Sequence, residues 1–435
     1  MLRWGRTTVA LAAGAVAAAL IAGCGPAATG GTAAPKPNAP PAKPFTVAIT
    51  PATGTANAPV STELGLSGVF GKVTAITLTQ AGGGAVGGNM RQDGTSWVPD
   101  APLKYSTAYQ ANVTGIGADG KSVTRTTSFT TMGQPGNTVG TGLYLQDGTT
   151  VGVAMPVVVE FDPPVPDSAR AAIQQRLFVS TMPFQPGVWH WDSGRQVEYR
   201  APQYWKTGTV ISVRSALQGL PMGDGSYGDT DRSATVTVGQ KVVMNVDNAT
   251  KQMSVYVNDQ LARQMPVSLG KPSTPSSSGT MVTMSHDYST IFDTTREGPG
   301  GYRVQVNYAM RLTWGGEFIH AAPWSVGDQG VRNVSHGCVN MSNGNSRWLF
   351  DITHIGDPVI VRGTEVTLVN GNGWTAWNIP WSEYVKGSAL PVPAQLAAVV
   401  STPESVSAKP VPAPPAAAPS ASATATPQPT PSRVG

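Results

Sequence analysis

Short segments in which apolar and polar residues alternate make up the chain from about residue 45 to residue 239. Residues 45–49, 75–79 and 109–113 are examples, and Gly, Asn and Asp occupy the turns between such segments. A period of two places successive side chains on opposite faces of the backbone, as in half-buried strands. The pattern therefore predicts an all-β region.

One stretch of this region is repeated, in outline, 100 residues further along the chain. Each copy runs from a proline through an aromatic residue into an alternating segment. The matched residues are Pro102, Tyr105, Thr107 and Val113 in the first copy and Pro202, Trp205, Thr207 and Val213 in the second. The repeat predicts two copies of one β-sandwich module, at 45–135 and 138–239.

A different arrangement begins near residue 241. Residues 343–352 are the one segment of this part that predicts a short helix. The predicted strands are 242–246, 253–257, 261–269, 302–306, 317–320 and 358–362. Together these elements predict a mostly β domain at 240–363, which is large enough for a core of its own, and a C-terminal subdomain at 364–387.

The composition supports a turn-rich β protein. Charged residues make up 12% of the chain, against a usual ~25%, and there are 50 glycines and 37 prolines. The net charge of +4 is small, and no run of Lys and Arg forms the basic face that nucleic acid requires. Nucleic acid is therefore not an expected partner. Pro and Ala dominate residues 25–44 and 388–435, which we interpret as a semi-extended tether and a disordered tail.

The N-terminus has the layout of an export signal. Arg3 and Arg6 precede an uncharged apolar run of 15 residues, shorter than the ~20 that a transmembrane helix needs. The run is followed by Ile-Ala-Gly-Cys, which resembles the bacterial lipobox, so Cys24 would be the acylated first residue of the mature protein. We expect a signal peptide at 1–23, a lipidated cysteine with its tether at 24–44, and anchoring at the outer face of the cytoplasmic membrane. Ordinary secretion is the alternative.

Lipid on Cys24 would leave the second cysteine, Cys338, without an intrachain disulfide partner. A lone thiol in an exported protein is either buried and inert or reactive. Two of the five histidines, His320 and His336, lie near it in the sequence. A thiol with a pKa of ~8.5 needs a base to become a nucleophile at neutral pH, and on spacing alone either histidine could serve. A buried cysteine beside two surface histidines is the structural alternative.

The residues next to Cys338 in the sequence also favour a role for it as a catalytic nucleophile. Gly337 would let a substrate carbonyl approach the backbone closely, and the amides of Gly337 and Cys338 could donate to an oxyanion. Asn340 would lie on the same side as Cys338 in an extended segment. His336 is too near in the sequence to point freely at the sulfur in many turn geometries, whereas His320 could arrive from a neighbouring strand.

These residues resemble a known family. His320, followed eighteen residues later by Cys338 within Ser-His-Gly-Cys-Val-Asn, is similar to the signature of the YkuD-like L,D-transpeptidase catalytic domain. His-Ala-Ala-Pro-Trp-Ser-Val-Gly at 320–327 and Trp-Asn-Ile-Pro-Trp at 377–381 resemble mycobacterial and actinobacterial members, and the tail is similar to that of a proline-tailed lipoprotein branch. The resemblance implies a mainly β fold: two immunoglobulin-like β-sandwich domains followed by a β-rich catalytic domain.

The resemblance also implies a reaction. Cys338 would attack the carbonyl of meso-diaminopimelate, the third residue of a peptidoglycan tetrapeptide stem, releasing D-Ala and forming a thioester. The amine of a second stem would then attack to give a 3→3 cross-link, with His320 as base and acid, and carbapenems would acylate the same sulfur. The positions that match substrate-contacting or pocket-lining ones are Tyr302, Gly315, Gly316, Asn340, Trp324, His336 and Ser335. For Tyr302 and Trp324, packing in a β core is the alternative.

Two other functions compete with the transpeptidase. Hydrolysis of the same acyl-enzyme would make an L,D-carboxypeptidase, and both reactions need Cys338 and His320. A non-catalytic wall-binding lipoprotein would need neither residue. The presence of His320 together with the Ser-His-Gly-Cys-Val-Asn motif therefore argues against this function.

The chain departs from the family at two positions. Ala321 stands where members often carry a serine that orients the base, so the backbone carbonyl of residue 321 would have to accept the Nδ1 proton. Gly315 replaces another frequent serine, which leaves contact there to the backbone.

No cofactor is expected, because the five histidines show no zinc-site spacing. The acidic loop that begins at Asp224 is a weak calcium candidate, and a plain surface turn is the favoured interpretation.

Overall fold

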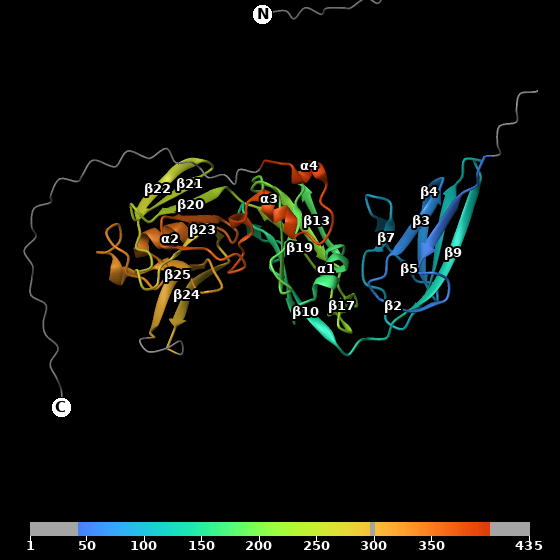
Figure 1. Cartoon of the computed structure of the whole chain (residues 1–435), viewed down its shortest axis with the longest axis horizontal. Coiled ribbons are helices and arrows are strands. Elements are labelled where there is room, and N and C mark those ends of the chain that lie inside the picture. Colours follow the sequence, from blue (N-terminus) through green and yellow to red (C-terminus); the bar gives the residue numbers. More distant parts are fainter. Residues whose placement is uncertain (1–41, 296–300, 401–435) are drawn as a thin grey trace, which may run out of the picture.

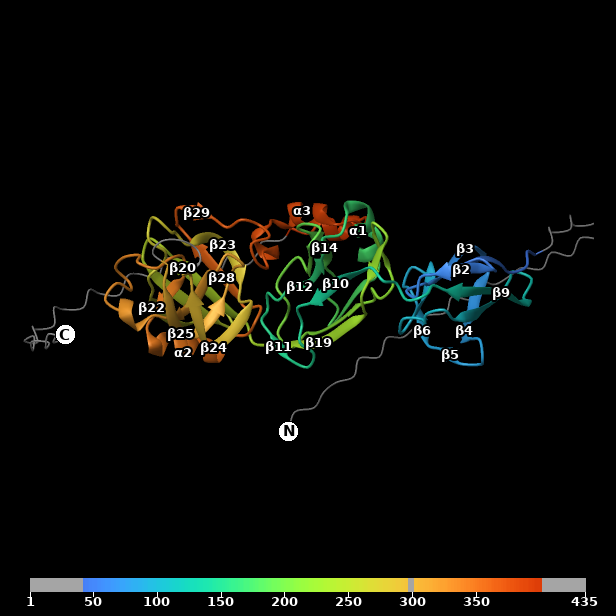
Figure 2. The ribbon, with the colours of Figure 1, turned by 90° about the horizontal axis from the view of Figure 1, so that it is seen from below.

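Three β-rich units follow one another along the chain in the computed structural model, which describes residues 42–295 and 301–400 (Figure 1). The view turned by 90° shows the same order, from the blue first unit through the green second unit to the yellow and orange third unit (Figure 2). The signal peptide and Cys24 lie outside the described residues, as do most of the tether and the end of the tail. No helix within the described ranges is both long and apolar enough to cross a membrane.

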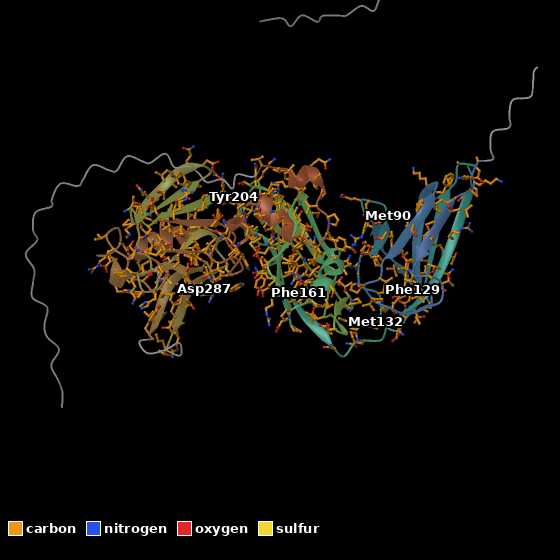
Figure 3. All side chains as sticks on the ribbon, viewed as in Figure 1. Met90, Phe129, Met132, Phe161, Tyr204 and Asp287 are labelled. Atoms are coloured by element: carbon orange, nitrogen blue, oxygen red, sulfur yellow. The ribbon has the colours of Figure 1, made fainter. Side chains whose placement is uncertain are left out.

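The first unit is a sandwich of a four-stranded and a five-stranded sheet. Leu64 and Trp97 are buried between the sheets, and Phe129 stacks on Tyr109 with 5.7 Å between ring centroids. Figure 3 labels Phe129 within this unit. In sheet order the strands are β1 (Thr46–Thr50), β3 (Leu64–Phe70), β7 (Ser96–Pro99) and β6 (Gly88–Met90), then β2 (Thr55–Ala58), β9 (Ser122–Thr131), β8 (Ala108–Ile116), β4 (Lys72–Gln80) and β5 (Ala85–Val86).

The second unit is a sandwich of a six-stranded and a four-stranded sheet around Phe161 and Trp205. In sheet order the strands are β14 (Val188–Trp191), β15 (Gln196–Arg200), β12 (Val157–Asp162), β10 (Thr138–Leu143), β18 (Ser226–Gly228) and β17 (Pro221–Gly223), then β11 (Thr150–Val151), β19 (Arg232–Val238), β16 (Val210–Ser215) and β13 (Leu177–Met182). The repeated stretches lead into corresponding strands, since β8 lies between β9 and β4, and β16 between β19 and β13. The structure thus has two sandwiches where the repeat predicts two.

One helix, α1 (Asp167–Gln174), interrupts the region that the sequence predicts to be all-β. It begins after Pro166, carries Asp167 in its first turn, where a negative charge is favoured, and buries Ala169 and Ile173. Eight residues contain too few apolar positions to separate a helical period from a strand period. The all-β prediction was therefore wrong for this segment.

The third unit also has a six-stranded and a four-stranded sheet. The first sheet is β22 (Gln260–Pro266), β21 (Gln252–Val257), β20 (Val242–Asp247), β28 (Pro358–Arg362), β23 (Ser277–Val282) and β29 (Val366–Thr367); the second is β24 (Ser285–Asp293), β25 (Arg303–Arg311), β26 (Phe318–Ala321) and β27 (Val339–Met341). The predicted bounds of β28 and of helix α2 (Asn343–Ile352) are confirmed. β23, β24, β27 and β29 were not predicted, and β24 is rich in polar residues on both faces.

Residues 374–396 pack on the second unit instead of forming a separate subdomain, and residues 401–435 of the predicted tail lie outside the described residues. Trp374, Trp377 and Trp381 belong to the same core cluster as Trp205, and Figure 1 shows this red segment lying over the second unit. Trp381 Nε1 also donates to Leu396 O at 3.0 Å, so a residue of the predicted tail contacts this segment. Its helices are η2 (Ala376–Asn378), α3 (Trp381–Tyr384), η3 (Val385–Gly387) and α4 (Ala394–Ala397). The separate subdomain was predicted because a single sequence does not show which distant apolar residues pack together.

Arg200 holds this C-terminal segment in place. Its guanidinium donates to Ala376 O at 3.0 Å and to Ile379 O at 2.8 Å. It also lies over three aromatic rings, those of Trp377, Trp381 and Tyr384. Burial lowers the pKa of Arg200 to about 10, so the side chain is still charged at neutral pH. The cation is thus compensated by carbonyls and ring faces.

We predict that Arg200→Met destabilises the second unit. The variant leaves buried carbonyls without donors, which costs about 3 kcal/mol and moves the urea transition by about 1–2 M to lower concentration. Urea titration followed by tryptophan fluorescence would measure the shift. The matched control is Arg195→Met, because Arg195 pairs with Asp162 at an exposed surface and its loss should leave the transition almost unchanged. Equal shifts of the urea transition in the two variants would contradict the role of Arg200 in holding the C-terminal segment.

Candidate active site

Two parallel strands bring His320 and Cys338 together. β26 pairs with β27 in a register that places Ile319 opposite Val339 and His320 opposite Asn340. Cys338 immediately precedes β27, so it lies beside the start of β26. His320 and Cys338 line one cavity of about 340 Å³. The structure therefore joins the two residues that the sequence suggested for nucleophilic catalysis.

The imidazole of His320 is buried and held in one orientation. Its Nδ1 donates to the backbone carbonyl of Ala321 at 2.9 Å, which leaves Nε2 as an acceptor. This bond is the one expected from the absence of a serine at 321. Burial lowers the pKa of His320, although the bond to Ala321 opposes the change. The ring is therefore neutral at neutral pH and has a free base nitrogen.

The thiol of Cys338 is buried and protonated. Its Sγ donates to the carbonyl of Gly316 at 3.7 Å, and Cys338 is unpaired with any other cysteine of the described ranges. Burial is the main cause that raises the pKa of Cys338 to about 12; the backbone amide of Phe318 opposes the increase, and the Glu317 carboxylate adds to it. The resting site thus holds a neutral thiol and a neutral imidazole.

Hydrogen bonds within the loop before Cys338 fix the position of the sulfur. Ser335 Oγ donates to Cys338 O at 2.6 Å and accepts from the amide of Gly337 at 3.2 Å. Ser276 Oγ donates to Gly337 O at 2.6 Å. Gly337 itself has a φ of +120°, a region that favours glycine.

Two expectations change at this loop. The amide of Gly337 is not free to bind an oxyanion, because Ser335 Oγ already accepts from it. The hydroxyl of Ser335, expected to contact substrate, is committed to the backbone of the loop. The sequence places Ser335, Gly337 and Cys338 close together, but it does not show which hydrogen bonds form, because these depend on the turn that the loop adopts.

The contacts of His336 do not suit the role of base. Its Nε2 lies 3.0 Å from Lys271 Nζ, and a lysine ammonium is only a donor, so this nitrogen accepts and the ring is neutral. Partial burial and the charge of Lys271 lower the pKa of His336. His320 is therefore the histidine whose geometry suits a base.

The other expected residues surround Cys338 in two cavities. Tyr302, Trp324 and Asn340 line the cavity of about 340 Å³. Gly315 and Gly316 line a second cavity of about 790 Å³, which Cys338 also lines. Trp324 is largely exposed, so it is not a residue of the β core.

Several residues of the site were missed in the sequence. Phe292 and Val304 line the smaller cavity from the hairpin β24–β25, whose first strand was not predicted. Lys271 lines the larger cavity, and Asn372 Oδ1 accepts from the amide of Gly315 at 2.8 Å. The sequence does not indicate that Lys271 or Asn372 belongs to the site, because each lies in a segment far from the cysteine motif.

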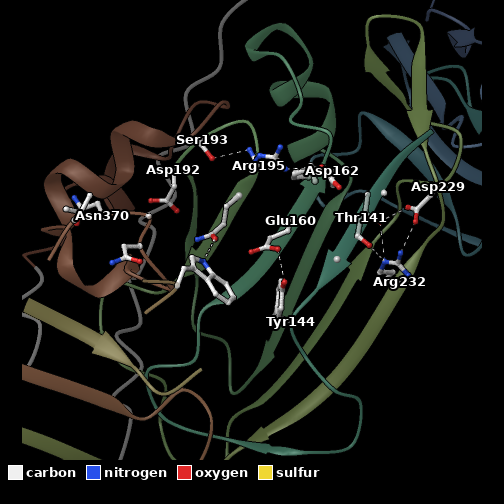
Figure 4. A pocket seen from close by; sticks show the side chains of 18 residues that line it. Thr141, Tyr144, Glu160, Asp162, Asp192, Ser193, Arg195, Asp229, Arg232 and Asn370 are labelled. Atoms are coloured by element: carbon white, nitrogen blue, oxygen red, sulfur yellow. Dashed lines mark hydrogen bonds and ion pairs between the residues drawn. The ribbon is translucent and has the colours of Figure 1, made fainter. Parts of the chain in front are cut away.

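A cavity of about 1050 Å³ lies between the second unit and the loop 369–372 (Figure 4). Its lining contains no cysteine or histidine, so it offers neither a thiol nor an imidazole. Five of its six charged side chains are bonded to one another or to a hydroxyl in three pairs: Tyr144–Glu160, Arg195–Asp162 and Arg232–Asp229. The sixth is Asp192, whose Oδ1 lies 3.9 Å from His190 Nε2. Size alone therefore does not identify the active site.

The acidic loop near Asp224 forms a turn between β17 and β18. Asp229 pairs with Arg232 and Asp231 with Arg214, so these carboxylates already have cationic partners. Within the part of the chain that is described, no group of three or more His, Cys, Asp or Glu side chains is placed to hold a metal ion.

We predict slow, base-dependent alkylation of Cys338. Because burial raises the pKa of this thiol to about 12, the rate with iodoacetamide should rise about tenfold per pH unit from about pH 6 to about pH 9 without a plateau. Peptide mass spectrometry of the full chain would give the rate at Cys338. His320→Gln is the control, and its profile should have the same slope. A plateau near neutral pH that is lost in His320→Gln would indicate an ion pair and contradict the prediction.

Comparisons with known proteins connect this geometry to a family. The L,D-transpeptidase catalytic domain profile matches residues 241–361, and the bacterial Ig domain profile matches residues 55–221. L,D-transpeptidase 2 of Mycobacterium tuberculosis (strain CDC 1551 / Oshkosh) is 34% identical over 341 residues, which are 77% of this chain and 82% of that protein. L,D-transpeptidase 5 of Mycobacterium tuberculosis (strain ATCC 25618 / H37Rv) is 35% identical over 346 residues, 78% of this chain and 74% of that protein.

A solved structure of the LD transpeptidase LdtMt1 in complex with imipenem is similar to part of the chain. It has a TM-score of 0.44 and 33% identity, and covers 52% of this chain and 100% of that chain. The family assignment depends on the sequence relatives, which match along most of both chains. Two sandwiches and a β-rich catalytic unit confirm the fold expected from the cysteine motif. The chain belongs to the L,D-transpeptidases, a family of enzymes that act on peptidoglycan.

Proposed function

We propose that this protein forms 3→3 cross-links between peptidoglycan stems through a thioester on Cys338. The observation that carries the proposal is the meeting of Cys338 and His320 across β26 and β27 in one cavity. The bond from His320 Nδ1 to Ala321 O leaves Nε2 free for a proton, which supports the role of base.

In the first step, His320 Nε2 takes the thiol proton while the sulfur of Cys338 bonds to the carbonyl carbon of the third stem residue. The bond from that carbon to the D-Ala nitrogen breaks, and the imidazolium returns the proton to the leaving nitrogen. In the second step, the side-chain amine of an acceptor stem attacks the thioester. The bond from the carbonyl carbon to the sulfur breaks, and His320 takes a proton from the amine and returns it to the sulfur, so Cys338 leaves as a thiol.

The environment of the sulfur suits a concerted proton transfer. Burial disfavours a free thiolate and a charged imidazole alike, so each charge should form only as the substrate reacts. The amide of Phe318 opposes the raised pKa of Cys338, and so favours negative charge on the sulfur as the proton leaves. We place the oxyanion at the amide of Cys338, since that of Gly337 is occupied.

The two cavities at Cys338 suit two stems. We place the acyl part of the donor stem in the cavity of about 340 Å³ and the leaving D-Ala in the cavity of about 790 Å³. The acceptor amine then takes the place that D-Ala vacates, because transfer to an amine retraces the path of acylation. Asp287 and Asp293 line this larger cavity and would attract a protonated amine, which loses one proton to solvent before it attacks.

We predict that the full chain in mild detergent converts a disaccharide-tetrapeptide to a 3→3 dimer with loss of D-Ala. Mass spectrometry should also show imipenem bound to the peptide that contains Cys338. Cys338→Ala should abolish both products, and His320→Gln should slow them by about 10²–10⁴-fold. The matched control is Cys24→Ala, which removes the other cysteine and should leave activity on soluble stems unchanged.

The products separate the alternatives. Tripeptide without dimer would show an L,D-carboxypeptidase and overturn the transferase. Products that persist in Cys338→Ala would overturn the thioester mechanism.

We also propose that lipid on Cys24 anchors the protein at the outer face of the cytoplasmic membrane, with residues 25–44 as the tether. In cells fed a labelled fatty acid, the native chain should carry the label and fractionate with membranes. Cys24→Ala should lose the label and move to the soluble fraction. A label that remains in Cys24→Ala, or an unchanged distribution, would contradict the anchor.

A further inference from the structure

The loop that carries Lys271 is bonded to the loop that carries Cys338. The amide of Lys271 donates to Ser335 O at 3.0 Å, directly after a bridge between Gly270 and Ser335. Thr274 Oγ1 donates to the same carbonyl at 3.3 Å, and the amide of Gly270 donates to Ser276 Oγ at 2.9 Å. The backbone of Lys271 is therefore held in place relative to the nucleophile.

The ammonium of Lys271 is also positioned. It lies 3.0 Å from His336 Nε2, and that nitrogen takes one of its three donors. Lys271, His336, Gly316 and Cys338 line the same cavity of about 790 Å³. Among residues 42–295 and 301–400, no carboxylate forms an ion pair with Lys271. Two N–H donors of a cation therefore remain for a ligand in the cavity that also reaches the sulfur.

The other charged groups of this cavity also have hydrogen-bond partners. Asp287 Oδ2 accepts from Ser285 Oγ at 2.7 Å. Arg311 Nη1 donates to Thr313 O at 3.1 Å, and its guanidinium lies over the ring of Phe318. Asp293 accepts two hydrogen bonds from Thr295. Lys271 is thus the cation of the cavity that is best placed to receive an anion.

The leaving group of the proposed reaction carries such an anion. D-Ala at the end of a tetrapeptide has its carboxylate on the carbon next to the scissile nitrogen, within about 4 Å of the carbonyl that the sulfur attacks. In a pentapeptide this carboxylate is an amide, and the free carboxylate lies about 3.6 Å further away.

We propose that Lys271 binds the terminal carboxylate of the donor stem and so selects stems with one residue after the scissile bond. The proposal rests on the proposed function, since it takes the larger cavity as the place of the leaving D-Ala. Charge-assisted hydrogen bonds from a positioned ammonium would favour the free acid over an uncharged analogue by about 10–100-fold.

Binding to the full chain can test this without turnover. In a Cys338→Ala background, calorimetry would compare a disaccharide-tetrapeptide with the same molecule ending in D-alaninamide. We expect the acid to bind about 10–100-fold more tightly. Adding Lys271→Met should weaken only the acid and bring the ratio close to one, and Lys271→Arg should restore most of the preference. Lys206→Met, an exposed lysine of the second unit, is the matched control and should keep the full ratio.

The ratio of the affinities for the acid and the amide distinguishes recognition of the carboxylate by Lys271 from damage to the loop that carries Lys271. If Lys271→Met weakens the acid and the amide by the same factor, or leaves the preference intact, the proposal is overturned. If the acid is preferred through Lys271 but the native chain releases no D-Ala, the assignment of Lys271 stands and the proposed function fails.

Discussion

The parallel pairing of β26 with β27 is the constraint on which the rest of the candidate site depends. Ile319, Val339 and Met341 are buried in the core of the third unit, and this burial fixes the register of the two strands. A shift of one residue would move each of these side chains to the opposite face and would separate His320 from Cys338. The site is therefore stabilised by the core beneath it as much as by its own contacts.

Backbone groups orient both proposed catalytic side chains within this frame. Ala321 O accepts from His320, and Gly316 O accepts from Cys338. A carbonyl in or beside a paired strand has little freedom, so it orients a ring without the entropy cost of ordering another side chain. The family's frequent serine after the base can therefore be lost here without loss of the tautomer. The same frame buries both groups, which keeps the pair neutral until a substrate arrives.

The sequence predicted what is local and missed what depends on contacts between distant segments. Strong local patterns gave the bounds of α2 and β28, and the cysteine motif identified Cys338 and its neighbours. Phe292 could not be placed in the cavity, because its strand is polar on both faces. Trp377 could not be placed in the second unit, because its Nε1 donates to Ala154 O, far away in the sequence.

The C-terminal segment connects the packing of the second sandwich to that of the third unit. Trp374 joins a core cluster that also contains Val282 and Met284 of the third unit, so the two units share buried apolar surface. Two residues before it, Asn372 accepts from the amide of Gly315, next to the carbonyl that holds the thiol. Separating the units would expose this shared surface to water, which makes a hinge between them costly. The position of the sulfur thus depends on packing that begins in the second sandwich.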